Sequence, residues 1–113
     1  MHEAGIIAGA IELAVQQAAA SGGIRVHKLC LRVGALSGVV PEALSFAFEL
    51  ARRQTMGDDA RLEIESVPAT WWCGTCQSEF QAEDCCPECP RCHQFSADLR
   101  RGRELELSSI EIS

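Results

Sequence analysis

Two Cys-x-x-Cys motifs constrain this 113-residue chain more than any other feature of its sequence. The first is Cys73-Gly74-Thr75-Cys76, and the second, Cys89-Pro90-Arg91-Cys92, follows after a spacer of residues 77–88. A Cys-x-x-Cys turn places two sulfurs on one edge of the tetrahedron that zinc prefers, and two such turns close the ligand shell and exclude water. The sequence therefore predicts a structural zinc site with four ligands, Cys73, Cys76, Cys89 and Cys92.

Three other interpretations of these cysteines are open. The run Trp72-Cys73-Gly74-Thr75-Cys76 resembles the redox motif of thioredoxins, but residues 77–84 lack the apolar stripe of the long helix that follows that motif. Disulfides would suit an exported chain, whereas this one has an odd number of cysteines, seven, and no signal-like N-terminus. An iron centre of the rubredoxin kind would use the same four sulfurs.

The second motif is itself ambiguous, because Cys86-Pro87-Glu88-Cys89 overlaps it with the same spacing. Cys85 and Cys86 are therefore spare thiols, alternative ligands or oxidation-prone side chains. His93 follows Cys92 directly, so it is either a replacement for a thiolate or an exposed histidine in a turn. The residues by themselves leave these choices open.

The composition argues against several classes of function. The formal net charge of −6 and the pI near 5.0 oppose binding to a nucleic-acid backbone, which requires a basic surface. No apolar stretch is long enough to span a membrane and the N-terminus has no signal-peptide features, so we expect a cytoplasmic protein with no membrane partner. The sequence has no recognisable Ser-His-Asp set, phosphate loop or pair of catalytic carboxylates, which argues against an enzyme.

Hydrophobic periodicity predicts an α+β fold. Apolar residues recur at helical spacing in two stretches, residues 6–19 and 41–53. They alternate as in half-buried strands in three others, residues 28–35, 61–67 and 104–112. We expect two helices on a small three-stranded sheet.

The segment of residues 70–101 lacks such periodicity and holds every cysteine except Cys30. A segment of this kind is expected to depend on its metal for order, because few apolar side chains are placed to build a core. We therefore expect two domains. One is an α/β domain of residues 1–69 plus 102–113, and the other is an inserted zinc-ribbon-like domain of residues 70–101.

The first three residues, Met1-His2-Glu3, offer a second kind of metal site. A free α-amine on Met1, a deprotonated backbone amide nitrogen and the His2 imidazole can all reach one ion in fused rings. Nickel(II) and copper(II) accept such square-planar nitrogen sets, which zinc does not favour. The same three residues also occur by chance at chain starts, so the chemistry alone does not decide.

Several further segments stand in order along the chain. They are the Ala-rich helix after Met1-His2-Glu3, both Cys-x-x-Cys motifs, and the runs Val33-Gly34-Ala35-Leu36-Ser37-Gly38-Val39, Pro41-Glu42-Ala43-Leu44, Phe46-Ala47-Phe48-Glu49, Gly102-Arg103-Glu104-Leu105 and Ser109-Ile110-Glu111-Ile112. Together they resemble the HypA/HybF family of nickel-incorporation proteins for hydrogenase maturation, and the resemblance covers essentially the whole chain. The spacing from Cys92 to Gly102 is similar to that of the family, which favours Cys89 and Cys92 as the second pair.

The resemblance implies a metallochaperone that delivers nickel to the large subunit of a [NiFe]-hydrogenase. Its expected partners are that subunit and a HypB-like GTPase, and a homodimer is a further candidate assembly. Met1, His2 and Glu3 would bind Ni(II) as transient cargo, which makes residues 1–69 plus 102–113 the nickel-binding domain. His2 would supply its imidazole, Met1 its amine, and Glu3 a backbone nitrogen or an outer carboxylate. The four cysteines would hold a structural Zn(II).

The chain departs from the family pattern in two places. Gly5 stands where members often have Ser, which should loosen the start of the first helix, and the extra Cys85 and Cys86 are unusual.

Two rival functions are a zinc-ribbon adaptor that only docks proteins, with an inert His2, and a thiol-disulfide oxidoreductase that uses the first Cys-x-x-Cys motif. Selective nickel binding would separate a delivery protein from an adaptor.

Overall fold

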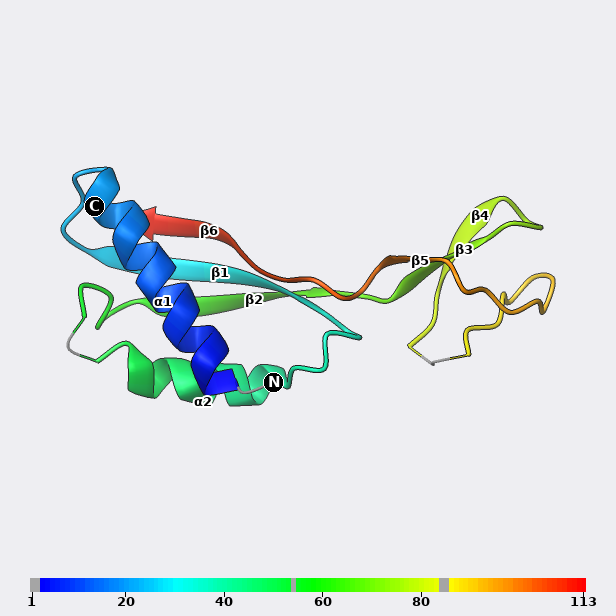
Figure 1. Ribbon diagram of the computed structural model, residues 1–113, viewed down its shortest axis with the longest axis horizontal. Helices are drawn as coiled ribbons and strands as arrows, with labels where there is room; N and C mark the ends of the chain where they lie inside the picture. The colour runs from blue at the N-terminus through cyan, green and yellow to red at the C-terminus, as the bar shows by residue number, and fades with distance from the viewer. Residues whose placement is uncertain (1–2, 54, 84–85) are drawn as a thin grey trace. The chain divides into compact units, whose positions relative to one another are not determined.

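The computed structural model describes residues 3–53, 55–83 and 86–113, so the predictions made for Met1, His2 and Cys85 lie outside the described residues. Its helices and strands follow one another along the chain (Figure 1) as α1 (Glu3–Ala20), β1 (Val26–Gly34), α2 (Pro41–Ala51), β2 (Arg61–Val67), β3 (Thr70–Cys73), β4 (Ser78–Gln81), β5 (Leu99–Arg101) and β6 (Leu105–Ile112).

These elements belong to two compact units. The first holds the described residues up to Arg32 together with Val39–Glu65 and Glu106–Ser113, and the second holds Val33–Gly38 and Ser66–Leu105. The division at residues 70 and 101 stays a prediction. The unit that contains residues 70–101 also takes in Val33–Gly38, a segment from a distant part of the sequence.

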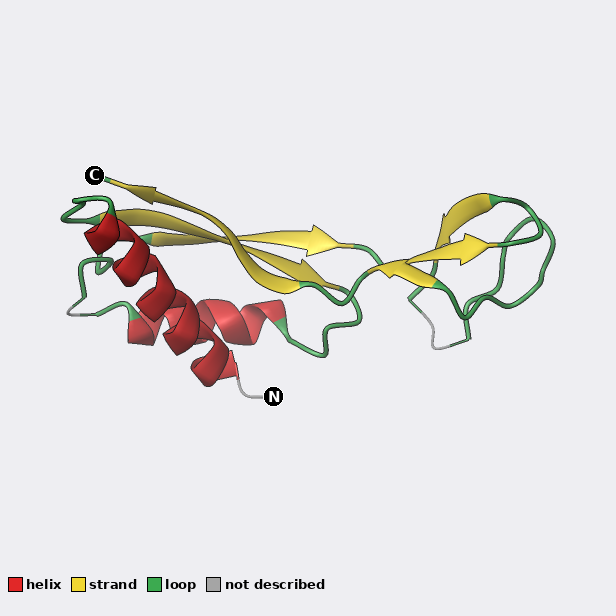
Figure 2. Cartoon of the chain, turned by 45° about the horizontal axis from the view of Figure 1, so that its top comes forward, coloured by secondary structure: helices red, strands yellow, loops and turns green. Residues whose placement is uncertain are grey.

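A three-stranded sheet with the order β2-β1-β6 carries the first unit. β1 and β2 run in the same direction and β6 runs in the opposite one (Figure 2). Two parallel neighbours need a crossover connection, and α2 supplies it between β1 and β2. The predicted α+β fold, two helices with a small three-stranded sheet, is confirmed.

The two helices cover one face of this sheet because their apolar residues recur at helical spacing. On β1, Leu29 and Leu31 are buried, whereas the alternating Lys28 and Arg32 are only partly so. The buried positions of α1 and α2 are Ile7, Ala10, Ile11, Ala14, Ala18, Leu44 and Phe48. Each large apolar side chain buried in this way stabilises the fold by about 1.5–3 kcal/mol. Within the described residues, no helix combines the length and the apolar character needed to cross a membrane.

The second unit contains a sheet of its own, with the order β4-β3-β5. β3 and β4 are antiparallel, with Trp71 opposite Phe80. Strands of three or four residues are too short to show an alternating pattern, so the sequence did not predict them. Trp71 and Phe80 pack around Cys73 and Cys89, with Leu36 also in contact. Apolar packing therefore orders this unit together with its cysteines, more than the lack of periodicity led us to expect.

The segment Val33–Gly38 passes the chain before β6 at very close range. A Cβ on Gly34 would collide with the backbone carbonyl of Gly102. Two backbone hydrogen bonds of 2.7 Å hold this crossing, from the Gly34 N–H to the Glu104 oxygen and from the Leu36 N–H to the Gly102 oxygen. Only glycine fits at position 34, and the crossing places Leu36 against the apolar cluster of the second unit.

Replacing Gly34 by Ala is expected to lower the free energy of unfolding by about 1–3 kcal/mol, because the added methyl overpacks a backbone crossing. Urea unfolding followed by tryptophan fluorescence measures it. Gly9→Ala is the matched control, because a Cβ at Gly9 meets nothing within 4 Å. That helical substitution should stabilise the protein by about 0.5–1 kcal/mol. An unchanged unfolding midpoint for Gly34→Ala would contradict the crossing.

Candidate metal centre

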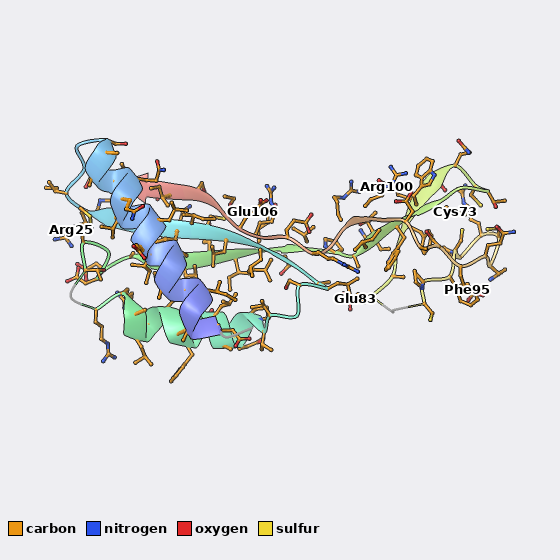
Figure 3. All side chains as sticks on the ribbon, viewed as in Figure 1. Arg25, Cys73, Glu83, Phe95, Arg100 and Glu106 are labelled. Carbon is orange, nitrogen blue, oxygen red and sulfur yellow. The ribbon has the colours of Figure 1, made fainter. Side chains whose placement is uncertain are left out.

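The four cysteines predicted as ligands lie together in the second unit. Cys73 ends β3 (labelled in Figure 3), Cys76 lies in the turn that leads to β4, and Cys89 and Cys92 come from the loop between β4 and β5. The four sulfurs all lie within 4.8 Å of one another. The Sγ atoms of Cys73 and Cys92 are 3.5 Å apart, and those of Cys76 and Cys89 are 3.9 Å apart.

These spacings fit a tetrahedral metal ion. With a zinc–sulfur bond of about 2.3 Å, the edge of the tetrahedron between two sulfurs is about 3.8 Å. A disulfide would require a sulfur–sulfur distance of about 2.05 Å, so none of these cysteines is bridged to another. Four sulfurs with no other donor suit zinc, and they also suit an iron centre. The donor set therefore fits the predicted structural zinc, and iron remains the chemical alternative.

The hydrogen bonds around the sulfurs shift the pKa values of two of the thiols in opposite directions. Backbone N–H groups of Cys92 and Arg91 donate to the Cys89 sulfur and lower the pKa of that thiol to about 6. The pKa of Cys76 is raised to about 12 by its hydrogen bond with the Cys92 sulfur and by burial. The four thiols cannot all ionise side by side unless a cation balances their charge. A metal ion at their centre would supply that charge.

Both Cys-x-x-Cys turns end in the same backbone conformation. Gln77 follows Cys76 with a φ of 53°, and His93 follows Cys92 with a φ of 64°. At this left-handed bend the His93 ring is 72% exposed and lies 3.7 Å from the Glu88 carboxylate. The structure thus places His93 as an exposed turn residue and outside the four-sulfur cluster.

The residues after the first motif also bear on the thioredoxin interpretation. A strand, β4, follows Cys76, and residues 77–83 contain no helix. The thioredoxin motif needs a long helix at this point, so that interpretation is wrong. Cys86 is exposed and lies outside the cluster, whereas Cys89 is only 2% exposed. Among the described residues, the structure therefore brings Cys89 together with Cys92 and the first motif.

Three polar side chains that the sequence did not single out support this arrangement. The Thr75 hydroxyl donates to Gln94 Oε1 at 2.6 Å, which ties the two turns to each other. The Ser96 hydroxyl donates to the Trp72 carbonyl at 2.6 Å, and the guanidinium of Arg100 (Figure 3) lies 4.8 Å from the Trp72 ring centre. No pattern marks these residues in the sequence, because the contacts join positions about twenty or more residues apart.

Of the three residues predicted to bind nickel, Glu3 is the one that the structure describes. Its carboxylate accepts a hydrogen bond of 3.3 Å from the backbone N–H of Val40, and Val40 is the N-cap residue of α2. Val40 has no side chain that could cap the helix itself. Glu3 therefore caps α2 from α1, at the end of α2 where the helix dipole favours a negative charge.

The chain is similar to known proteins along almost its whole length. Residues 1–112 match the family model described as hydrogenase/urease nickel incorporation, metallochaperone, HypA. Hydrogenase maturation factors HypA from a Picosynechococcus strain and from Geotalea uraniireducens are each 41% identical to this chain over 112 residues. The HypA of Acidithiobacillus ferrooxidans is 34% identical over the same length. Each of these alignments covers 99% of both chains.

Two solved structures share the fold. The solution structure of the Ni metallochaperone HypA from Helicobacter pylori has a TM-score of 0.68 at 24% identity, and covers 99% of this chain and 97% of its own. A second solution structure of a HypA protein has a TM-score of 0.72 at 23% identity, and covers 100% and 97%. At these identities the likeness establishes the fold alone.

Removing the metal of the four-cysteine site with a chelator is expected to disorder the second unit and leave the first intact. The two tryptophans of the chain, Trp71 and Trp72, both belong to the second unit, so their emission should shift to the red. The helical circular dichroism should persist, because α1 and α2 belong to the first unit. Loss of both signals together would contradict independent ordering of the two units.

Single cysteine substitutions test the ligand set. Cys89→Ser is expected to lose bound zinc because it removes a buried thiolate from a closed shell. Cys86→Ser is the matched control and should retain zinc at the level of the unsubstituted protein. Metal content after dialysis, determined by mass spectrometry, gives the comparison. Equal zinc loss in both variants would mean that Cys86 is a ligand.

Proposed function

The chain belongs to the HypA family of hydrogenase/urease nickel-incorporation metallochaperones, and from this premise we propose that it binds Ni(II) through Met1-His2-Glu3 and delivers it to the large subunit of a [NiFe]-hydrogenase. The observation that carries the proposal is the family match over residues 1–112, which includes these three residues. The family is one of metal carriers and maturation factors, so the chain is not an enzyme.

The chemistry of the two sites supports different roles for two metals. Four thiolates that close a shell hold Zn(II) permanently, and we propose that Cys73, Cys76, Cys89 and Cys92 do so. A set of nitrogen ligands on consecutive residues suits square-planar Ni(II). Such a site has few ligands and little burial, so it can release its metal to an acceptor. Zinc is then the resident structural ion and nickel the cargo.

The position of Glu3 supports one assignment within the nickel site. Its carboxylate is engaged with the Val40 N–H at the start of α2. We infer that Glu3 offers nickel its backbone nitrogen, while its side chain anchors the N-terminal turn of α1 to α2. His2 then supplies the imidazole and Met1 the amine.

Membership of a hydrogenase maturation family implies interaction with the hydrogenase maturation machinery. We propose that the finer partners are a HypB-like GTPase and the hydrogenase large subunit, with cytoplasmic delivery. A homodimer stays a prediction. The acidic balance of the chain, −6, supports protein partners over nucleic acid.

Nickel titration of the zinc-loaded protein tests the proposal. The native N-terminus is expected to bind stoichiometric, diamagnetic Ni(II), the signature of a square-planar site. His2→Ala and a variant with one residue added before Met1 should both lose this site while zinc stays bound. If all three proteins bind nickel equally well, the N-terminal site is wrong and a zinc-ribbon adaptor is the better account.

Two substitutions at Glu3 separate its side chain from its backbone. Glu3→Ala is expected to lower the free energy of unfolding by about 0.5–2 kcal/mol, because α2 loses its cap. Glu3→Gln keeps a carbonyl oxygen for the Val40 N–H and should cost less. Both variants should retain nickel affinity close to that of the unsubstituted protein. Loss of nickel in both, with the fold intact by circular dichroism, would make the carboxylate a ligand.

A further inference from the structure

The helical layer of the first unit carries acidic side chains and no basic ones. α1 contains Glu3 and Glu12, α2 contains Glu42 and Glu49, and neither helix has a Lys or an Arg. Glu49 is paired with Arg52, just beyond the helix end, at 2.8 Å. Within the described residues, Glu12 and Glu42 have no basic partner. This face therefore presents uncompensated negative charge.

The other face of the same sheet is different. Lys28 on the central strand bridges Glu63 on one side and Glu111 on the other, at 3.2 and 3.5 Å. Arg32, also on β1, bridges two more glutamates in the same manner. Each of these four carboxylates on the strand face thus has a basic partner within the protein, whereas Glu12 and Glu42 on the helical face have none among the described residues.

An apolar groove of about 520 Å³ lies on this helical face. Ala8, Ile11, Glu12 and Val15 of α1 line one side, and Ala51 and Met56 contribute to the other. The α1 residues that line it extend from Ala8 to Gln16, a rise of about 12 Å or about two helical turns. Ala8 on α1 and Ala51 on α2 have small side chains, and this leaves the space that forms the groove.

Exposed apolar side chains extend the groove across α2. At about 100° per residue, the positions Ala51, Ala47, Leu50 and Phe46 follow one another around the helix, away from the buried stripe. Leu50 is 52% exposed and Phe46 is 69% exposed. Their spacing of four residues places them in one row. A groove with this extension is an apolar surface that nothing in the described chain covers.

We propose that this α1–α2 groove, with Phe46 and Leu50, is a docking surface for an amphipathic helix of a partner protein that carries basic residues beside its apolar row. The apolar row would fill the groove and cover Phe46 and Leu50. Its Lys or Arg side chains would meet Glu12 and Glu42, which have no basic partner among the described residues. Charge complementarity of this kind favours such a helix over an acidic one or a second copy of the acidic face.

The docking surface lies on the same two helices that Glu3 and Val40 join. Glu3 is hydrogen-bonded to Val40, so the first turn of α1 lies at the N-terminal end of α2. A helix docked along the groove would bring its parent protein to the unit that carries Glu3. This consequence, a docking surface for the acceptor or donor of nickel, rests on the proposed function. The docking of a basic amphipathic helix on the groove does not depend on the proposed function.

Two synthetic peptides test the docking on the zinc-loaded full chain. Both have the same row of leucines at helical spacing, and one carries Lys and Arg beside it where the other carries Glu. Fluorescence anisotropy measures binding, and backbone amide NMR shifts locate it. The basic peptide is expected to bind at least about tenfold more tightly than the acidic one and to shift residues 8–16 and 46–51. Equal affinity, or shifts elsewhere, would overturn the proposal.

Matched variants link the binding to the groove. Phe46→Ser with Leu50→Ser should weaken the basic peptide at least about tenfold, because two apolar contacts are lost. Phe95→Ser is the control, because Phe95 is 70% exposed but belongs to the second unit, and it should change nothing. Glu12→Gln with Glu42→Gln should weaken binding and reduce its salt dependence. Unchanged affinity in both the serine and the glutamine variants would overturn the docking.

Further measurements on the same samples distinguish this docking proposal from self-association and from the proposed nickel binding. Sedimentation should give the same oligomeric state for Phe46→Ser/Leu50→Ser as for the unsubstituted protein. A shift from dimer to monomer would instead make the surface a self-association site and overturn the proposal. Nickel stoichiometry should not change in that variant. If the peptide docks but the N-terminus does not bind nickel, the docking proposal stands and the proposed function is refuted. If the N-terminus binds nickel but the peptide does not dock, the proposed function stands and the docking proposal is refuted.

Discussion

The mutual repulsion of four thiolates within 4.8 Å of one another is the constraint on which the second unit depends. Backbone N–H groups stabilise the charge on Cys89, while burial and the neighbouring sulfur oppose it on Cys76. A tetrahedral cation resolves this conflict because it attracts all four sulfurs equally. Three-residue and four-residue strands have little stability by themselves. A metal ion held by the four sulfurs, beside the Trp71–Phe80 cluster, would give them a fixed frame.

The crossing at Gly34 and Gly102 is the second constraint. A segment that follows the central strand of the first unit enters the second unit there and contributes Leu36 to its apolar cluster. Two backbones can approach this closely only where one of them has no Cβ. The segment then continues to Val40, whose N–H binds Glu3. One short stretch of chain thus takes part in the packing of the metal-holding unit and in the capping of α2.

The two faces of the first unit differ in whether their glutamates have basic partners. On the strand face, Lys28 and Arg32 each bridge two glutamates, so each of these carboxylates has a basic partner. On the helical face, Glu12 and Glu42 have no basic partner among the described residues, and Phe46 and Leu50 are exposed. A carrier must both hold its cargo and contact the proteins that exchange it. The helical face, with its apolar groove and the carboxylates of Glu12 and Glu42, is the part of this unit that we propose for such a contact.

The sequence by itself determined the α+β class, the three strands of the larger sheet and the two helices, because local periodicity records which side of an element is buried. Cys-x-x-Cys spacing likewise identified Cys73, Cys76 and Cys89, since a turn of four residues is a local geometry and Cys89 belongs to both overlapping motifs. The family resemblance favoured Cys92 over Cys86 as its partner, a choice that spacing alone left open because two overlapping turns are locally equivalent. The tertiary structure brings Cys92 into the four-sulfur cluster and leaves Cys86 exposed. The short strands β3 to β5, the Gly34–Gly102 crossing and the Glu3 cap were equally beyond the sequence. Each depends on contacts between residues far apart in the chain, and no local pattern encodes those.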